Sequence, residues 1–136
     1  MAKQKLLDVV ITVNSVDLSS QISSVVLNNG YEDLDSTAFG DTAKRHEGGL
    51  STGSLQINWK PDTDLSTTAV AIDAIKNTVV AATVKLDNAA ISSANPEAQF
   101  NVWIGETLPF GGAVGSLYEP STTWQLDTVV TYDTTP

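Results

Sequence analysis

The stretch "GSLQINWK", from Gly53 to Lys60, decides the fold because its apolar and polar side chains alternate without a break. Leu55, Ile57 and Trp59 fall on one face of an extended chain, and polar side chains fall on the other face. A period of two residues is typical of a β-strand with one buried face. We therefore predict a core strand here, with Trp59 as a core residue.

Segments on both sides of this strand are rich in β-branched and aromatic residues, as β-strands are. The turn signals Asn14-Ser15 and Asn28-Asn29-Gly30 separate the early ones. The further predicted strands cover residues 7–13, 16–30, 78–87, 98–106, 121–126 and 128–133. We expect a mainly β fold, either a β-sandwich or a partly open barrel, in a single domain of residues 1–136.

Residues 64–77 are the exception, because their apolar side chains recur every three or four residues. This spacing predicts one short α-helix on the outside of the sheets. Asp64 or Ser66 would cap its start, and Asn77 would end it.

The segment "TAFGDTAKRHEGGL", from Thr37 to Leu50, lies between two predicted strands. It is too long for a hairpin turn, and Phe39 is too apolar for a solvated one. We therefore predict a long loop over about residues 30–50, and the question is what it contacts.

Charge and composition exclude several classes of protein. The chain has 136 residues, a net charge of −9 and no cysteine, so disulfides, thiolate metal sites and cysteine nucleophiles are excluded. No Lys or Arg follows Lys85, whereas proteins that bind DNA neutralise its phosphates with Lys and Arg. We expect no specific binding of nucleic acid.

The N-terminal segment has Lys3 and Lys5 before an apolar run, but Asp8 interrupts the run and no signal-peptidase site follows. No apolar stretch reaches the roughly 20 residues of a membrane helix. We expect synthesis in the cytoplasm and no insertion into a membrane.

The sequence offers little for catalysis or metal binding. His46 is the single histidine, and we interpret it as a solvated loop residue rather than a general base. The acidic pairs Asp33/Asp35 and Asp62/Asp64 do not continue into a calcium-binding loop, so turn and cap roles are favoured. We predict no enzyme activity, no cofactor and no metal.

Several blocks of sequence resemble one family in order and spacing. They are "VDLSSQISSVVLN" from Val16, "DSTAFGDTAKRHEGGLSTGSLQINW" from Asp35, Asn95-Pro96, "PFGGAVGSL" from Pro109 and "STTW" from Ser121. Together they resemble the major tail tube protein of long-tailed, siphovirus-type bacteriophages. That resemblance implies a structural subunit that forms hexameric rings, which stack into a hollow tube in the virion tail for genome delivery into the host.

The resemblance also implies partners and sites. The partners would be other copies of the chain, the tail tip or baseplate initiator, the tape measure protein and the tail terminator, with DNA passing through the lumen unbound. The long loop would be an inter-ring assembly loop, which becomes ordered when rings stack. Its contact residues would be Tyr31, Leu34, Thr37, Phe39, Gly40, Asp41, Lys44, Arg45, Gly49 and Leu50. Carboxylates facing the lumen would repel DNA, and the candidates are Asp87, Glu97, Glu106 and Asp127.

Other functions remain open at this stage. A carbohydrate-binding β-sandwich could stack sugar rings on Trp103 or Trp124. Trp103 alternates with Phe100, Val102 and Ile104, so it points away from their face. The inner tube protein of a contractile tail or a related injection machine is a further alternative, and a small hydrolase ranks last.

Overall fold

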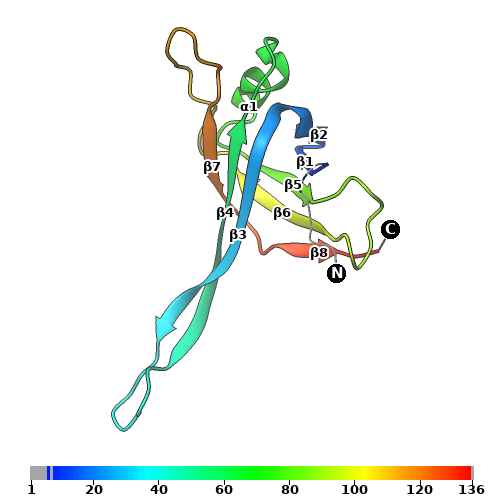
Figure 1. The fold of residues 1–136 in the computed structure, drawn as a ribbon. Helices are drawn as coiled ribbons and strands as arrows, with labels where there is room; N and C mark the ends of the chain where they lie inside the picture. Colours follow the sequence, from blue (N-terminus) through cyan, green and yellow to red (C-terminus); the bar gives the residue numbers. More distant parts are fainter. Residues whose placement is uncertain (1–5, 7, 136) are drawn as a thin grey trace.

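The computed structural model describes Leu6 and residues 8–135, so Lys3, Lys5 and Leu7 of the predicted first segments lie outside the described residues. Its strands form two antiparallel sheets (Figure 1). The larger sheet has the order β2-β1-β5-β6-β8. Its strands are β1 (Val10–Val13), β2 (Val16–Asp17), β5 (Val79–Lys85), β6 (Glu97–Trp103) and β8 (Thr131–Asp133).

The smaller sheet has the order β3-β4-β7, with β3 (Ile22–Asp35), β4 (His46–Trp59) and β7 (Ser121–Gln125). The two sheets meet at one corner through the isolated bridge between Val102 and Leu126. The mainly β sandwich predicted from the sequence is confirmed, and the described strands form no closed barrel. The Asn14-Ser15 turn is also confirmed, because both residues have positive φ between β1 and β2.

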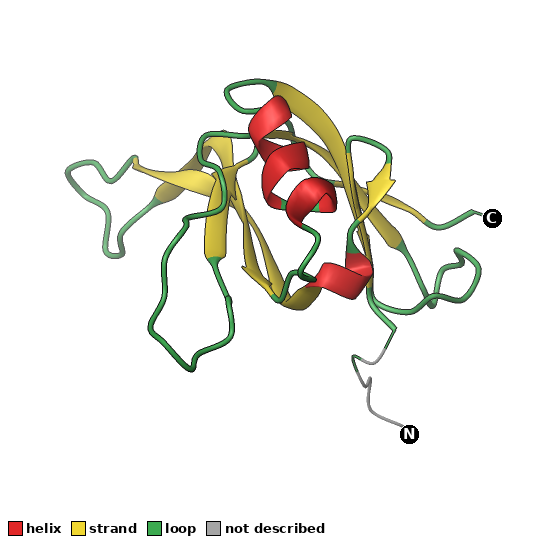
Figure 2. Ribbon diagram, turned by 90° about the horizontal axis from the view of Figure 1, so that it is seen from above, coloured by secondary structure: helices red, strands yellow, loops and turns green. Residues whose placement is uncertain are grey.

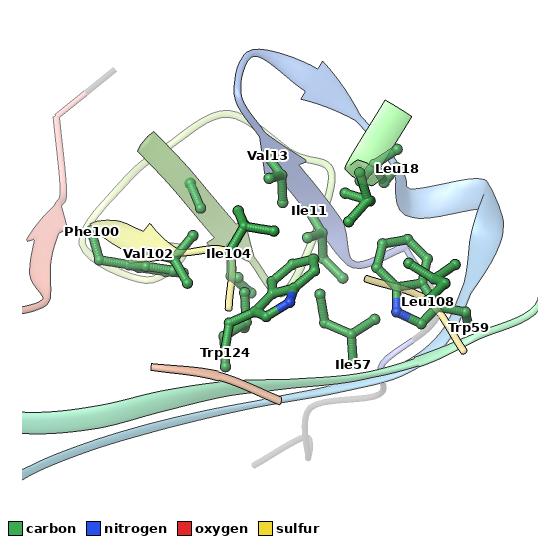
Figure 3. Packing of buried hydrophobic residues seen from close by; sticks show 14 of the residues in the cluster. Ile11, Val13, Leu18, Ile57, Trp59, Phe100, Val102, Ile104, Leu108 and Trp124 are labelled. Atoms are coloured by element: carbon green, nitrogen blue, oxygen red, sulfur yellow. The ribbon is translucent and has the colours of Figure 1, made fainter. Parts of the chain in front are cut away.

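The core lies between the sheets and is centred on β4, as its alternation predicts (Figure 3). Leu55, Ile57 and Trp59 are completely buried. The ring of Trp59 meets that of Trp124 edge to face, with the centroids 6.1 Å apart. The Trp59 Nε1–H donates to Thr122 Oγ1 at 3.0 Å, so the one polar atom of its ring is satisfied inside the core.

The helix is shorter than the predicted range of 64–77. A short 3₁₀ helix η2 (Leu65–Thr67) precedes α1 (Ala69–Ala74). Thr68 separates them because its backbone angles, φ −122° and ψ −86°, are not helical. Asp64 caps η2 by accepting from the Ser66 N–H at 3.0 Å, and Asn77, with positive φ, follows α1 as expected.

The predicted loop over residues 30–50 is largely wrong. β3 does not end at Gly30 but continues to Asp35, and β4 begins already at His46. Gly30 pairs with Thr52 across the ladder, so the local turn preference of Asn28-Asn29-Gly30 is overridden by strand pairing. The true connection is residues 36–45, at the tip of a long hairpin.

This hairpin gives the molecule two distinct ends. Its tip projects well beyond the sandwich at one end (Figure 1). The helix and the loop that precedes β7 lie at the other end, and the view from above shows the helix across the end of the two sheets (Figure 2). The surfaces exposed at the two ends are therefore built from different segments of the chain.

Candidate assembly surface

The outer part of the hairpin, residues 30–52, is here called the arm. β7 pairs with β4 only from Ser54 to Asn58, and β3 is the edge of its sheet, so the arm is a two-stranded ribbon with both edges unpaired by described strands. Two-stranded ribbons are marginally stable in water, and open edges are sites where further strands add. The arm therefore has the backbone chemistry of a contact surface.

The tip of the arm is closed by its own polar groups. Thr37 Oγ1 accepts from the Arg45 N–H at 2.8 Å, and Asp41 Oδ2 accepts from the Ala38 N–H at 2.8 Å. Gly40 has φ +95°, which favours glycine. The residues of the Thr-x-Phe-Gly-Asp motif thus hold the turn, and they present the remaining member, Phe39, at its apex.

Phe39 is fully exposed, with a relative accessibility of 109%. Tyr31, Leu34 and Leu50 in the strands of the arm are also exposed. Large apolar side chains gathered on a projecting element are typical of interaction sites. The structure brings these predicted contact residues onto one element, although as a paired ribbon rather than an irregular loop.

The charges of the arm are solvated. The Arg45 guanidinium lies 3.7 Å from Asp41, and exposed pairs of this kind contribute little to stability. The pKa of the Asp35 carboxyl is lowered by the hydrogen bonds that it accepts from Thr37. Lys44 and Gly49 of the predicted contact set also lie on the arm, Lys44 exposed and Gly49 partly buried.

His46 is not in a loop as expected, but begins β4, and its Nδ1 lies 2.7 Å from Asp33 Oδ1. Both side chains are exposed. A hydrolytic triad would add a hydroxyl on the other ring nitrogen, and none of the described residues supplies one within hydrogen-bond distance. The pair therefore has the geometry of a surface link between β3 and β4.

The four acids predicted to line a lumen are dispersed over the larger sheet and its loops. Glu97 begins β6, between Lys85 and Asp133 of the neighbouring strands. Glu106 follows the other end of β6, a strand about 20 Å long, and its Oε1 accepts from the Thr123 N–H at 2.6 Å. Asp87 and Asp127 are exposed in loops. They do not form one cluster, and their role stays a prediction.

The tryptophans separate by burial. Trp124 is 1% exposed and donates from its ring to the Glu106 carbonyl at 2.8 Å, so it is excluded as a platform for sugars. Trp103 is exposed, as its alternation predicts, and its ring packs over Gly105. The carbohydrate alternative thus rests on a single aromatic side chain.

Sequence reasoning missed a second apolar surface, in the loop between β6 and β7. Phe110, Val114 and Leu117 are all exposed there. Gly112 and Gly115 in this loop have positive φ, which favours glycine. The sequence does carry a signal for this surface. Large apolar residues alternate with glycines there, and their spacing matches neither a strand nor a helix that would bury them.

Neither a metal site nor a membrane span is found in the described part of the chain. No group of three or more His, Cys, Asp or Glu residues among residues 6 and 8–135 is placed to hold a metal ion. No described helix is long and apolar enough to cross a bilayer.

Comparison with known proteins finds a likeness in fold to several solved chains. No protein-family model matches the chain, and no curated protein is similar to it in sequence. The fold is similar to that of a chain in a structure described as the virion of a native gene transfer agent particle. The TM-score is 0.70 at 13% identity, over 93% of this chain and 95% of the other. At this identity the likeness shows a shared fold.

Proposed function

We propose that this chain is a structural subunit of a virion, and that copies of it form hexameric rings that stack into a tail tube. The projecting arm carries the proposal. A chain from the virion of a gene transfer agent particle shares the fold nearly from end to end. The sequence blocks that resemble tail tube proteins support the more specific role.

The energetics of the arm favour assembly. Phe39 is fully exposed, and Tyr31, Leu34 and Leu50 keep about half or more of their surface exposed. The hairpin that carries them projects away from the sandwich (Figure 1). Burying a large apolar side chain contributes roughly 1.5–3 kcal/mol. A neighbouring copy can supply this burial, and its strand edges can pair with those of the arm.

The charge of the chain fits a conduit. A net charge of −9 gives the subunit an acidic surface, and carboxylates on a lumen wall repel DNA and keep it from adhering. In this proposal Asp87, Glu97, Glu106 and Asp127 are the candidates for that wall. DNA passes through without specific binding during genome delivery. The tube would join the initiator at the tail tip, the tape measure protein and the terminator, in a non-contractile tail.

Removal of the arm tests the proposal. Gly30 and Thr52 pair directly, so an Asn-Gly turn can replace residues 31–51 and close a short hairpin. We expect this variant to keep the circular dichroism and the buried tryptophan fluorescence of the full chain. The full chain should form rings or tubes in electron micrographs at high concentration or with an initiator, and the variant should not.

Two results would contradict the proposal. If the full chain stays monomeric under both conditions, the chain is not a tube subunit. If the variant lacking the arm assembles as well as the full chain, the arm is not the contact surface that drives assembly.

A further inference from the structure

A groove lies at the end of the molecule opposite the tip of the arm. It has a volume of about 410 Å³ and is open to the surface. One wall comes from the segment after β4, with Pro61, Asp62 and Leu65, and the other comes from the loop before β7, with Phe110, Leu117 and Tyr118. Most of these side chains are apolar, so the groove suits an apolar ligand group.

Both walls are held by contacts within the subunit. The Tyr118 hydroxyl donates to the Pro109 carbonyl at 2.6 Å, and its ring packs against Phe110 with the centroids 6.0 Å apart. On the other wall, Asp62 Oδ2 accepts from Gln21 Nε2 at 2.7 Å, and its N–H donates to Gln21 Oε1 at 2.7 Å. A surface that is already shaped needs less ordering when it binds.

The charges around the groove and at the tip are opposite. Residues 60–66 and 106–119 contain Asp62, Asp64, Glu106 and Glu119, with Lys60 as the one base. Residues 37–45 contain Lys44 and Arg45, with Asp41 as the one acid. The pKa of Asp64 is lowered by its hydrogen bonds from Ser66, so this carboxylate stays charged at neutral pH. Asp62 is the one charged residue that lines the groove, and Lys60 lies 3.9 Å from Glu119, so the acidic rim consists of Asp62 and the nearby Asp64. At the tip, Asp41 pairs with Arg45, which leaves one base in excess.

The two surfaces lie at opposite ends of the molecule (Figure 1). A contact between different surfaces of two identical copies repeats without closing when the copies are related by translation along an axis. Such a contact produces a linear stack, which a tube requires.

We propose that the tip of one copy docks into the groove of a second copy, with Phe39 between the two walls and Lys44 and Arg45 beside the acidic rim. This inference rests on the proposed function, because the stack of rings supplies the second copy. It adds the receptor surface, which is the loop of residues 109–118 together with the segment after β4.

Disulfide cross-linking tests the contact directly, because the chain contains no cysteine. Ala38→Cys places a thiol beside Phe39, and Ser116→Cys places one at the groove. Ser93→Cys, at an exposed residue in the loop before β6, is the matched control. Mixed under assembly conditions, the Ala38→Cys and Ser116→Cys chains should form disulfide dimers at least tenfold faster than Ala38→Cys with Ser93→Cys. A chain carrying both Ala38→Cys and Ser116→Cys should form a ladder of multimers.

The outcome separates this inference from the proposed function. If tubes form but the Ala38/Ser116 pair reacts no faster than the control pair, the tip docks elsewhere, and the tube proposal stands without this contact. If neither tubes nor the selective cross-link form, both proposals fail.

A second measurement checks the chemistry of the contact. Phe39→Ala should raise the concentration at which assembly begins by roughly 10- to 100-fold, the effect of losing a buried aromatic side chain, whereas Phe39→Leu should raise it much less. Leu117→Ala should also raise it. The double variant should lose less than the product of the two single losses, because the side chains contact each other across the interface. Fully multiplicative losses would overturn the contact.

Discussion

The two halves of β4 share one ladder with β3 and differ in almost everything else. In the inner half, Leu55, Ile57 and Trp59 are completely buried, and β7 covers the second edge. In the outer half, from His46 to Leu50, the side chains are mostly exposed, and no described strand pairs with the second edge. Backbone pairing with one neighbour is therefore enough to form a strand, whereas a paired second edge and a buried face make the strand part of the core.

The largest expected effect tests the inner half. Trp59→Ala removes the edge-to-face contact with Trp124 and the hydrogen bond to Thr122, and it leaves a large cavity. We expect a loss of about 3–5 kcal/mol in the free energy of unfolding. Urea denaturation followed by circular dichroism measures it. Phe39→Ala in the arm is the control and should change stability by less than about 0.5 kcal/mol.

If the two variants lose the same free energy of unfolding, the tip is part of the cooperative core, and the two halves of β4 do not differ in the way described.

Two glycines of β4 give a matched pair at the boundary. A Cβ at Gly53 would lie 2.8 Å from the Asn28 carbonyl oxygen and 2.7 Å from Leu126 Cδ1, whereas a Cβ at Gly48 meets nothing within 4 Å. Gly53→Ala should therefore cost about 1–3 kcal/mol of stability. Gly48→Ala should lie within about 0.5 kcal/mol of the unaltered chain. Thermal unfolding of the two variants measures the difference. Similar melting temperatures would show that the chain around Gly53 is not closely packed against Asn28 and Leu126.

The smallest expected effect compares two aspartates with the same local geometry. Hydrogen bonds from Ser19 lower the pKa of Asp17, and hydrogen bonds from Thr37 lower that of Asp35. Ser19 Oγ also accepts from the Ile11 N–H at 2.9 Å, which links Asp17 to the core, whereas Asp35 acts within the arm.

A carboxyl whose folded pKa lies below its unfolded value of about 3.8 stabilises the fold above that pH, and this contribution is lost as the pH falls through the folded pKa. Asp17→Asn should therefore lower the melting temperature slightly at pH 7, and the difference from the unaltered chain should vanish in strong acid. Asp35→Asn should leave global unfolding unchanged at both pH values. If Asp17→Asn lowers the melting temperature equally at both pH values, the charge of Asp17 does not contribute to stability.

Much of the core could be predicted from the sequence, because its signals are local. The alternation around Trp59 identified the buried face, and the same pattern placed Trp103 outside. The helix was too long in our prediction because Thr68 breaks it, and its buried side chain gives no signal in a three- and four-residue spacing. The residues predicted for the contact lie together on the arm and their role stays a prediction, whereas most of the expected loop is a paired ribbon.

The error at Gly30 has a physical cause. Asn28-Asn29-Gly30 has the composition of a turn, and nothing nearby in the chain contradicts it. Its conformation is decided by Ser54, Gly53 and Thr52, which supply the opposite side of the ladder. Pairing with a strand more than 20 residues away outweighs the local turn preference. This pairing is visible only in the folded chain.

By itself the sequence determined the class of fold, the buried face of the central strand, the acidic balance and the absence of thiol chemistry, because periodicity, charge and composition are properties of the chain. The folded molecule alone shows how far the hairpin extends, that Trp124 is buried, and that a mostly apolar groove beside Asp62 lies at the opposite end from the apolar tip. These features depend on contacts between distant segments, which fix what is covered and what is left for a neighbour.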